Sequence, residues 1–392
     1  MTVIDIRNIF SDRNIEIADV TPSYVYYAEE KNNANGSELF LLEYNRSTGK
    51  ERLITNYTLE DPTFVEHIFS FENTMIILLE NGLNSVWLIE INKSTGVELN
   101  RKKIVCTGAF HSCTALDSEH ILIYMAPDEE NYAVFEKYKE VTGSDCLCYL
   151  YDLKTNQKHF VRSSLIARLG VEGMRVIDVH GEKFVILLDP FAAEDIKEHY
   201  FREQRWINAD IRDNIWLCGV KDLEAEIESG SEEISKKSIA SADIKALVRY
   251  MGTDGDKIYF RAKEFRNGTE KICSYNAFVN TLDVEADISR PYGENTVFII
   301  DEKPFRTFVV TQQDGKVKIK GIVNSDADTE YDSQLGNFLI CEDNRYIVTE
   351  KTFPVKDSDE SKTCYYLYDS QTKNYESYEC KCLIKGGTIV LY

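Results

Sequence analysis

Two segments of this 392-residue chain carry side chains that could recognise a partner. Segments 126–145 and 189–213 both combine aromatic rings with cationic groups, although the chain as a whole has a formal net charge of −21. Aromatic and arginine side chains dominate the binding energy of protein interfaces, because they bury large areas and offer directed hydrogen bonds. The candidate binding residues are Tyr132, Tyr138, His199, Arg202, Arg205 and Trp206.

The same side chains also have a purely structural interpretation. Tyr132, Phe135 and Lys139 share one face of a helix at i, i+3 and i+7, with Val134 and Tyr138 beside them. In that interpretation the aromatic stripe packs the helix onto the rest of the protein and the charges are solvated. Both interpretations stay open at this point.

The motifs of known catalytic centres are absent from the sequence. The six histidines are scattered, none of them in an HExxH helix, and the sequence has no Gly-x-Ser-x-Gly elbow and no phosphate-binding glycine loop. Acidic segments such as 324–328 lack the glycine and distal glutamate of a calcium loop. We therefore expect no metal, no cofactor and no catalytic residue. The alternative is an enzyme that acts on a carbohydrate or small polar substrate in an axial cleft, with paired carboxylates about 5 to 10 Å apart.

The elements that would carry these residues belong to a repeat. In each copy an Asp or Asn closes an apolar strand and a Thr follows three residues later, at Asn45, Asn92, Asp152 and Asp369. An Asp or Asn side chain can accept hydrogen bonds from the backbone two residues ahead, and Gly or Asn accepts the positive φ of a hairpin turn. The pattern predicts a series of β-hairpins at a regular period.

The hairpins group into seven units of four strands, each about 50 to 60 residues long, which predicts an all-β propeller. The repeats resemble those of bacterial propellers of the quinoprotein-like and TolB-like kind, in which an aromatic-Asp-x-x-Thr-Gly turn joins the two outer strands. The resemblance covers nearly the whole chain and implies a single domain over residues 1–392. The alternative is eight blades, the last one shared by both termini, with strand 2–10 pairing with the C-terminal tail.

Helical insertions at 126–145 and 189–213 interrupt two neighbouring units at the same position, and a short helix is expected at 163–169. Together these segments would cap one face of the propeller. The segment 223–238, which is first acidic and then basic, is expected to be a solvated loop on the opposite face.

The charge balance limits the partners. A net charge of −21 disfavours nucleic acid and anionic membranes, and no apolar run approaches the length of a membrane span. The absence of a signal-peptide pattern and the ten cysteines, which we expect to be thiols, point to the cytoplasm. The sequence therefore favours a non-catalytic scaffold that binds a protein or peptide on its capped face, and the acidic charge suits a cationic one. It leaves the oligomeric state open.

Overall fold

The structure is a computed structural model that describes residues 2–5, 14–21, 23–33, 36–59, 64–80, 85–188, 215–239, 246–264, 269–288, 296–302, 305–354, 361–380, 382–385 and 388–391. The described residues belong to two compact units. Those of the N-terminal unit fall within Asp12–Glu194 and Asn214–Ser238, and those of the C-terminal unit within Met1–Ser11 and Ile239–Tyr392.

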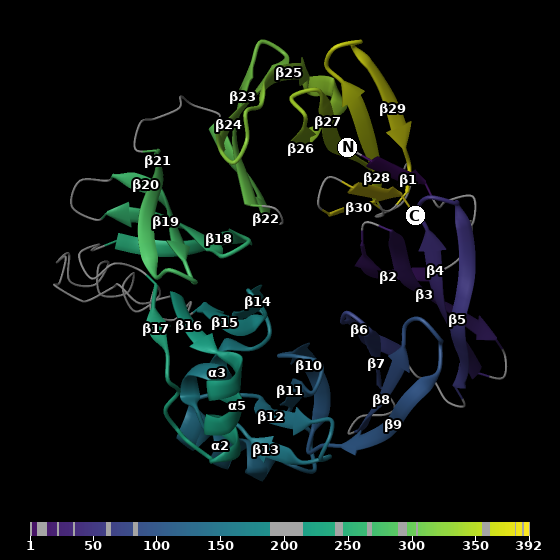
Figure 1. The fold of residues 1–392 in the computed structure, drawn as a ribbon, viewed down its shortest axis with the longest axis vertical. Coiled ribbons are helices and arrows are strands. Elements are labelled where there is room, and N and C mark those ends of the chain that lie inside the picture. Colours follow the sequence, from purple (N-terminus) through teal and green to yellow (C-terminus); the bar gives the residue numbers. More distant parts are fainter. Residues whose placement is uncertain are drawn as a thin grey trace. The chain divides into compact units, whose positions relative to one another are not determined.

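The N-terminal unit contains four antiparallel sheets, each made of four strands in chain order (Figure 1). The first sheet has β2 (Asn14–Val20), β3 (Tyr24–Asn33), β4 (Gly36–Asn45) and β5 (Lys50–Leu59). The second has β6 (Phe64–Ser70), β7 (Thr74–Glu80), β8 (Ser85–Asn92) and β9 (Glu98–Val105). The third has β10 (Ala109–Ala115), β11 (His120–Ala126), β12 (Leu147–Asp152) and β13 (Lys158–Phe160). The fourth has β14 (Met174–Val179), β15 (Glu182–Leu188), β16 (Ile215–Gly219) and β17 (Lys237–Ser238).

The C-terminal unit contains three more four-stranded sheets and one three-stranded sheet. The first has β18 (Ala246–Asp254), β19 (Lys257–Glu264), β20 (Glu270–Asn276) and β21 (Thr281–Asp287). The second has β22 (Thr296–Glu302), β23 (Phe305–Gln313), β24 (Lys316–Val323) and β25 (Asp328–Asp332), followed by the 3-10 helix η1 (Ser333–Leu335). The third has β26 (Asn337–Glu342), β27 (Tyr346–Pro354), β28 (Ser361–Asp369) and β29 (Asn374–Tyr378). The last combines β1 (Thr2–Asp5), β31 (Thr388–Leu391) and β30 (Cys382–Lys385).

This succession of antiparallel four-stranded sheets is the topology of an all-β propeller, as predicted. Seven sheets have the expected four strands. The eighth matches the alternative count, because β1 from the N-terminus pairs in parallel with β31 from the C-terminus. The prediction that the 392 residues form one domain stays a prediction.

The repeated turn forms as the sequence predicts. Oδ1 of Asn45, Asn92, Asp152 and Asp369 accepts, in each turn, the backbone N–H groups of the residues two and three positions ahead. The positive φ falls on Gly49, Gly96, Asn156 and Lys373. A short polar side chain in this position therefore fixes the hairpin locally, before any tertiary contact is needed.

The β10–β13 sheet is the rigid support of the helices. All six residues of β12 are buried, and they alternate between two cores. Cys148 and Leu150 join the core shared with the β14–β17 sheet, whereas Leu147, Tyr149 and Tyr151 join the core shared with the β6–β9 sheet. Side chains alternate between the two faces of a strand, so this sheet is fixed from both sides.

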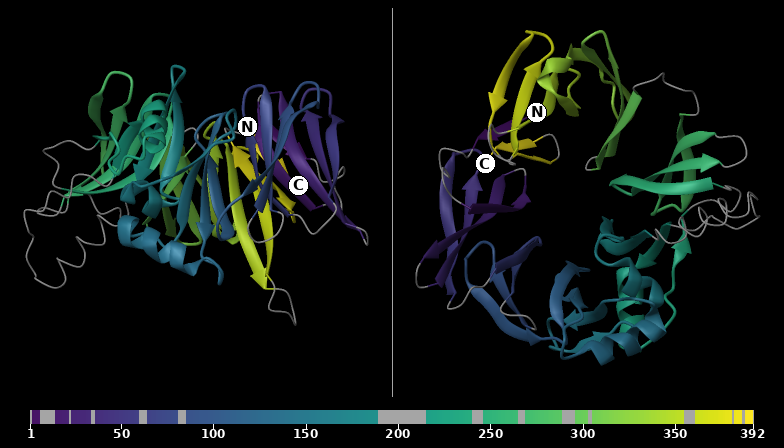
Figure 2. Two further views of the ribbon diagram at one scale, coloured as in Figure 1. Left: turned by 90° about the horizontal axis from the view of Figure 1, so that it is seen from below. Right: turned by 180° about the vertical axis from the view of Figure 1, so that it is seen from behind.

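Three helices accompany this sheet: α2 (Tyr132–Thr142), α3 (Ser164–Leu169) and α5 (Val220–Glu228). The helices α2 and α3 confirm the predicted insertion at 126–145 and the predicted short helix at 163–169, and they pack side by side. Figure 2 shows α2 along one end of the strands. The predicted insertion at 189–213 lies outside the described residues. None of the described helices is long and apolar enough to cross a bilayer.

The prediction of a solvated loop over 223–238 is wrong for the first part of that segment, while most of residues 229–236 are exposed and outside any helix or strand. The first part of that segment belongs to α5, which buries Val220, Leu223 and Ile227 in the core shared by the β10–β13 and β14–β17 sheets. These residues are spaced at i, i+3 and i+7 and so form one apolar stripe, which outweighs the many charges between them.

Candidate functional site

Helix α2 is held by a narrow buried stripe. Phe135 and Thr142 are buried and Tyr138 is half-buried, at a spacing that places all three on one helix face. The Tyr138 hydroxyl donates a 2.5 Å hydrogen bond to the carbonyl of Val161, and burial raises the pKa of Tyr138. Gly108 has a φ of +93°, and a Cβ there would collide with the Phe135 ring. The glycine therefore permits the close approach of α2 to the sheet.

A cavity of about 660 Å³ lies where the end of α2, the end of α3 and the β10–β13 sheet meet. Two side chains tie its walls together. Ser144 Oγ lies 2.9 Å from the carbonyl oxygens of both Cys146 and Ala167, and the Tyr124 hydroxyl donates a 3.0 Å hydrogen bond to the carbonyl of Ile166. The lining residues are His111, Ser112, Tyr124, Gly143, Ser144, Asp145, Cys146, Ala167, Arg168, Leu169, Gly170, Val171 and Glu172.

The cavity presents charges of both signs beside apolar surface. Arg168 contributes a guanidinium, while Asp145 and Glu172 contribute carboxylates. The Cys146 thiol also lines it, but burial and the neighbouring Asp145 raise the pKa of Cys146, so this thiol stays protonated near neutral pH. The arrangement suits non-covalent binding of a polar ligand better than nucleophilic chemistry.

The candidate residues from the sequence fall into three groups. Tyr132 stands on α2 with 59% of its surface exposed and is free to contact a partner. Tyr138 is the residue that fastens α2 to the backbone after β13, so its place in the molecule matches the structural interpretation. The remaining candidates lie outside the described residues: His199, Arg202, Arg205 and Trp206.

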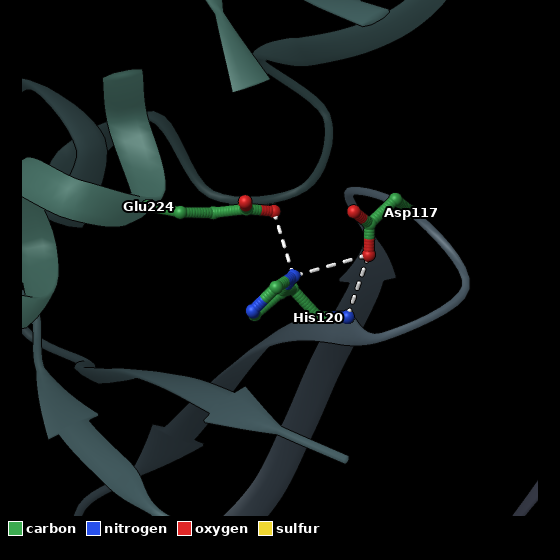
Figure 3. A group of neighbouring side chains, drawn as sticks. All are labelled: Asp117, His120 and Glu224. Carbon is green, nitrogen blue, oxygen red and sulfur yellow. Dashed lines mark hydrogen bonds and ion pairs between the residues drawn. The ribbon is translucent and has the colours of Figure 1, made fainter. Parts of the chain in front are cut away.

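The opposite end of the β10–β13 sheet holds a compact group of ionisable side chains. His120 Nδ1 lies 3.2 Å from Asp117 Oδ1 and 2.9 Å from Glu224 Oε1 (Figure 3). The Nδ1 atom of an imidazole carries at most one proton, so it can donate to only one of these two oxygens. Glu224 Oε1 is buried and accepts no hydrogen bond from the described residues, and its contact with His120 Nδ1 is an ion pair only when the imidazole is protonated.

Local turn chemistry and the α5 stripe position these three residues. Asp117 Oδ1 accepts the backbone N–H groups of Glu119 at 2.7 Å and His120 at 2.8 Å, which fixes the β10–β11 turn. Glu224 follows Leu223, whose burial sets the rotation of α5 and turns Glu224 toward the sheet. Glu224 is consequently only 8% exposed.

Two further carboxylates lie beside His120. Asp152 and Glu228 each place an oxygen within 4.8 Å of a His120 nitrogen. Burial and the negative charge of Asp117 raise the pKa of Glu224 to about 7. The pKa of Asp152 is shifted the other way. Burial raises this pKa, but hydrogen bonds from Thr155 and Lys154 outweigh burial and lower it below its ordinary value. The same cluster therefore contains one carboxylate that resists ionisation and one that favours it.

Sequence reasoning missed this cluster for an identifiable reason. Asp117 and His120 are three residues apart, but Glu224 lies more than a hundred positions further along the chain. The i, i+3, i+7 stripe of Val220, Leu223 and Ile227 predicts a helix with Glu224 next to the buried face, but it does not predict the contact with His120.

No family model matches the chain, and no curated protein matches its sequence. Among solved structures, a prolyl endopeptidase is similar at a TM-score of 0.45 and 10% identity, over 93% of this chain and 49% of that one, so this chain spans about half its length. An uncharacterised protein from Listeria monocytogenes is similar at a TM-score of 0.41 and 12% identity, over 96% of this chain and 95% of that one. The β-propeller domain of the Trilobed protease from Pyrococcus furiosus is similar at a TM-score of 0.39 and 10% identity, over 94% of this chain and 93% of that one.

Proposed function

We propose that this protein is a non-catalytic binding scaffold that holds a peptide segment of a partner protein in the cavity between α2, α3 and the β10–β13 sheet. The observation that carries the proposal is the cavity itself, about 660 Å³ with walls tied together by Ser144 and Tyr124. Ligand sites are typically preformed hollows of roughly 300 to 1,000 Å³ with a few polar groups among apolar ones. A rigid site loses little conformational freedom on binding.

The charge distribution suggests what the peptide carries. Asp145 at the cavity is already ion-paired with Lys139, whereas Glu172 is exposed. In a chain of net charge −21, a segment with Lys or Arg is therefore attracted over a distance and pairs with Glu172 on arrival. Arg168, whose Nε donates a 3.2 Å hydrogen bond to the Ser164 carbonyl, adds one positive charge to the cavity wall. The exposed ring of Tyr132, at the first turn of α2 and outside the cavity lining, offers apolar contact area to a segment that extends along the helix.

Affinity capture with the full chain tests this proposal. The bound proteins are compared for wild type, Tyr132→Ala and Glu172→Lys, with Glu232→Lys as a control that makes the same charge change in an exposed loop. We expect one partner that binds wild type and the control but is reduced at least tenfold with Glu172→Lys. Equal capture by all four proteins would overturn the proposed site. If the wild-type protein instead released a small polar product from the captured partner, the enzyme alternative would be favoured.

A further inference from the structure

We propose that Asp117, His120 and Glu224 form a binding site for a divalent transition-metal ion of the zinc class, which would join α5 to the β10–β11 turn. The three side chains come from separate elements and converge on one point, with ligand atoms that all lie within 4.8 Å of one another (Figure 3). No part of this inference depends on the peptide-binding cavity, which lies at the other end of the same sheet.

The distances between the ligand atoms of the three side chains fit one ion bound by all three. Zinc bonds to His nitrogen and carboxylate oxygen are about 2.0 to 2.2 Å long, so two ligand atoms at tetrahedral or octahedral angles lie roughly 2.9 to 3.5 Å apart. His120 Nδ1 is 2.9 Å from Glu224 Oε1 and 3.2 Å from Asp117 Oδ1. These distances also suit hydrogen bonds, but a single Nδ1 proton serves only one of the two carboxylates.

Glu224 supplies the second, independent observation. Its Oε1 atom is buried and points at the imidazole in Figure 3, where a dashed line marks its ion pair with His120. Beyond that pair it receives no hydrogen bond from any residue that the structure describes. The Glu224 side chain is 11% exposed, and a buried carboxylate oxygen that accepts no hydrogen bond is unfavourable. An ion bound between Asp117, His120 and Glu224 would satisfy that oxygen. Partial exposure of the Asp117 and His120 side chains, at 24% and 15%, leaves a path from solvent.

The donor set selects the class of ion. An imidazole nitrogen disfavours Mg²⁺ and Ca²⁺, which prefer all-oxygen shells, while the two carboxylates disfavour Cu⁺, which prefers sulfur. Three protein ligands leave a fourth position for water. Asp152 and Glu228, the other two carboxylates near His120, add negative charge and can orient the ring from outside the ligand set.

Zinc binding to the metal-free full-length chain tests the inference. Bound zinc is measured by equilibrium dialysis, and thermal stability is followed with increasing ZnCl₂, with MgCl₂ and CaCl₂ as comparison ions. Wild type is compared with Glu224→Gln and His120→Gln, and Glu232→Gln serves as the matched control on an exposed position. The Gln substitution keeps the size of the Glu side chain, and circular dichroism verifies that each variant is folded.

We expect wild type and Glu232→Gln to bind one zinc ion that both ligand variants bind at least tenfold more weakly, and zinc to raise Tm only in the first two. Zinc held by any of the ten cysteines would be equal in all four proteins and so cancels in the comparison. Equal zinc affinity in wild type and Glu224→Gln, no zinc binding in wild type, or preferential binding of Mg²⁺ or Ca²⁺ would each overturn the proposal.

Discussion

The two ends of the β10–β13 sheet differ in how their polar side chains are paired. At the α2–α3 end, hydroxyl groups of Tyr124, Tyr138 and Ser144 each reach a backbone carbonyl, and a hollow is left between satisfied walls. At the α5 end, charged groups face one another, and the buried Glu224 Oε1 has an ion pair with His120 but accepts no hydrogen bond from the described residues. The first arrangement suits a hydrogen-bonded framework that receives a ligand, and the second suits an ion that completes the framework.

The largest effect is expected from removing the apolar anchor of the α2–α3 end. Phe135 is 3% exposed, and Phe135→Ala should lower the free energy of unfolding by about 3–5 kcal/mol, because it removes a buried ring and leaves a cavity. Chemical denaturation measures this change, with Val134→Ala, 43% exposed on the same helix, as the near-neutral control. A loss below about 1 kcal/mol would mean that α2 is not anchored through this ring.

The second effect concerns the α5 end and depends on pH. The folded pKa of Glu224 is about 7, above its ordinary value of 4.5, so the folded state holds the proton more tightly than the unfolded state. The stabilisation of the folded state by the protonated Glu224 carboxyl is therefore fully present below about pH 4.5 and is lost as pH rises through 7. In EDTA, wild type should lose on the order of 1–2 kcal/mol between pH 5 and 8 relative to Glu224→Gln.

This pH comparison separates the two ends cleanly. Glu172→Gln, at the cavity, replaces an exposed carboxyl and should leave the pH dependence of stability as it is in wild type. If Glu224→Gln and Glu172→Gln changed the pH profile equally, the contrast between a satisfied and an unsatisfied end would be lost.

The sequence predicts the local parts of this molecule well and the long-range parts poorly. The turns at Asn45, Asn92 and Asp152 depend on a side chain and its own backbone, so the residues themselves reveal them. The same local signal gives the sheets and α2. The contact of Glu224 with His120 depends on how two sheets stack around Leu223, and no pattern within either segment carries that information. Of the expected cap, the structure describes only the α2–α3 part.

A smaller effect at the α2–α3 end comes from one hydrogen bond. Tyr138→Phe removes the donor to the Val161 carbonyl while keeping the ring, and should cost about 0.5–1.5 kcal/mol. Thermal or chemical denaturation checks this value, with Tyr132→Phe on the exposed side of α2 as the control. Peptide binding at the cavity should be unaffected by Tyr138→Phe beyond the loss of stability. A selective loss of binding in the folded variant would instead make Tyr138 a contact residue.

The smallest effect is expected in the repeated turn, where the copy at Asn92 serves as the control for the copy at Asp152. Thr155 donates a 2.5 Å hydrogen bond to Asp152 Oδ2, and Thr95 donates a 3.0 Å hydrogen bond to Asn92 Oδ1 in the equivalent turn of the β6–β9 sheet. Thr155→Ala and Thr95→Ala should each cost about 0.5–1 kcal/mol, because each loses one hydroxyl that satisfies a turn acceptor.

Only the first of these variants also alters the surroundings of His120. Without the Thr155 hydroxyl, the pKa of Asp152 rises and the carboxylate is freer to turn, so its influence on the imidazole changes. Thr155→Ala should therefore weaken zinc binding a few-fold, whereas Thr95→Ala should leave it unchanged, both measured by the same dialysis. Equal zinc affinity in the two variants would restrict the metal site to Asp117, His120 and Glu224 and would assign Asp152 to the hairpin turn alone.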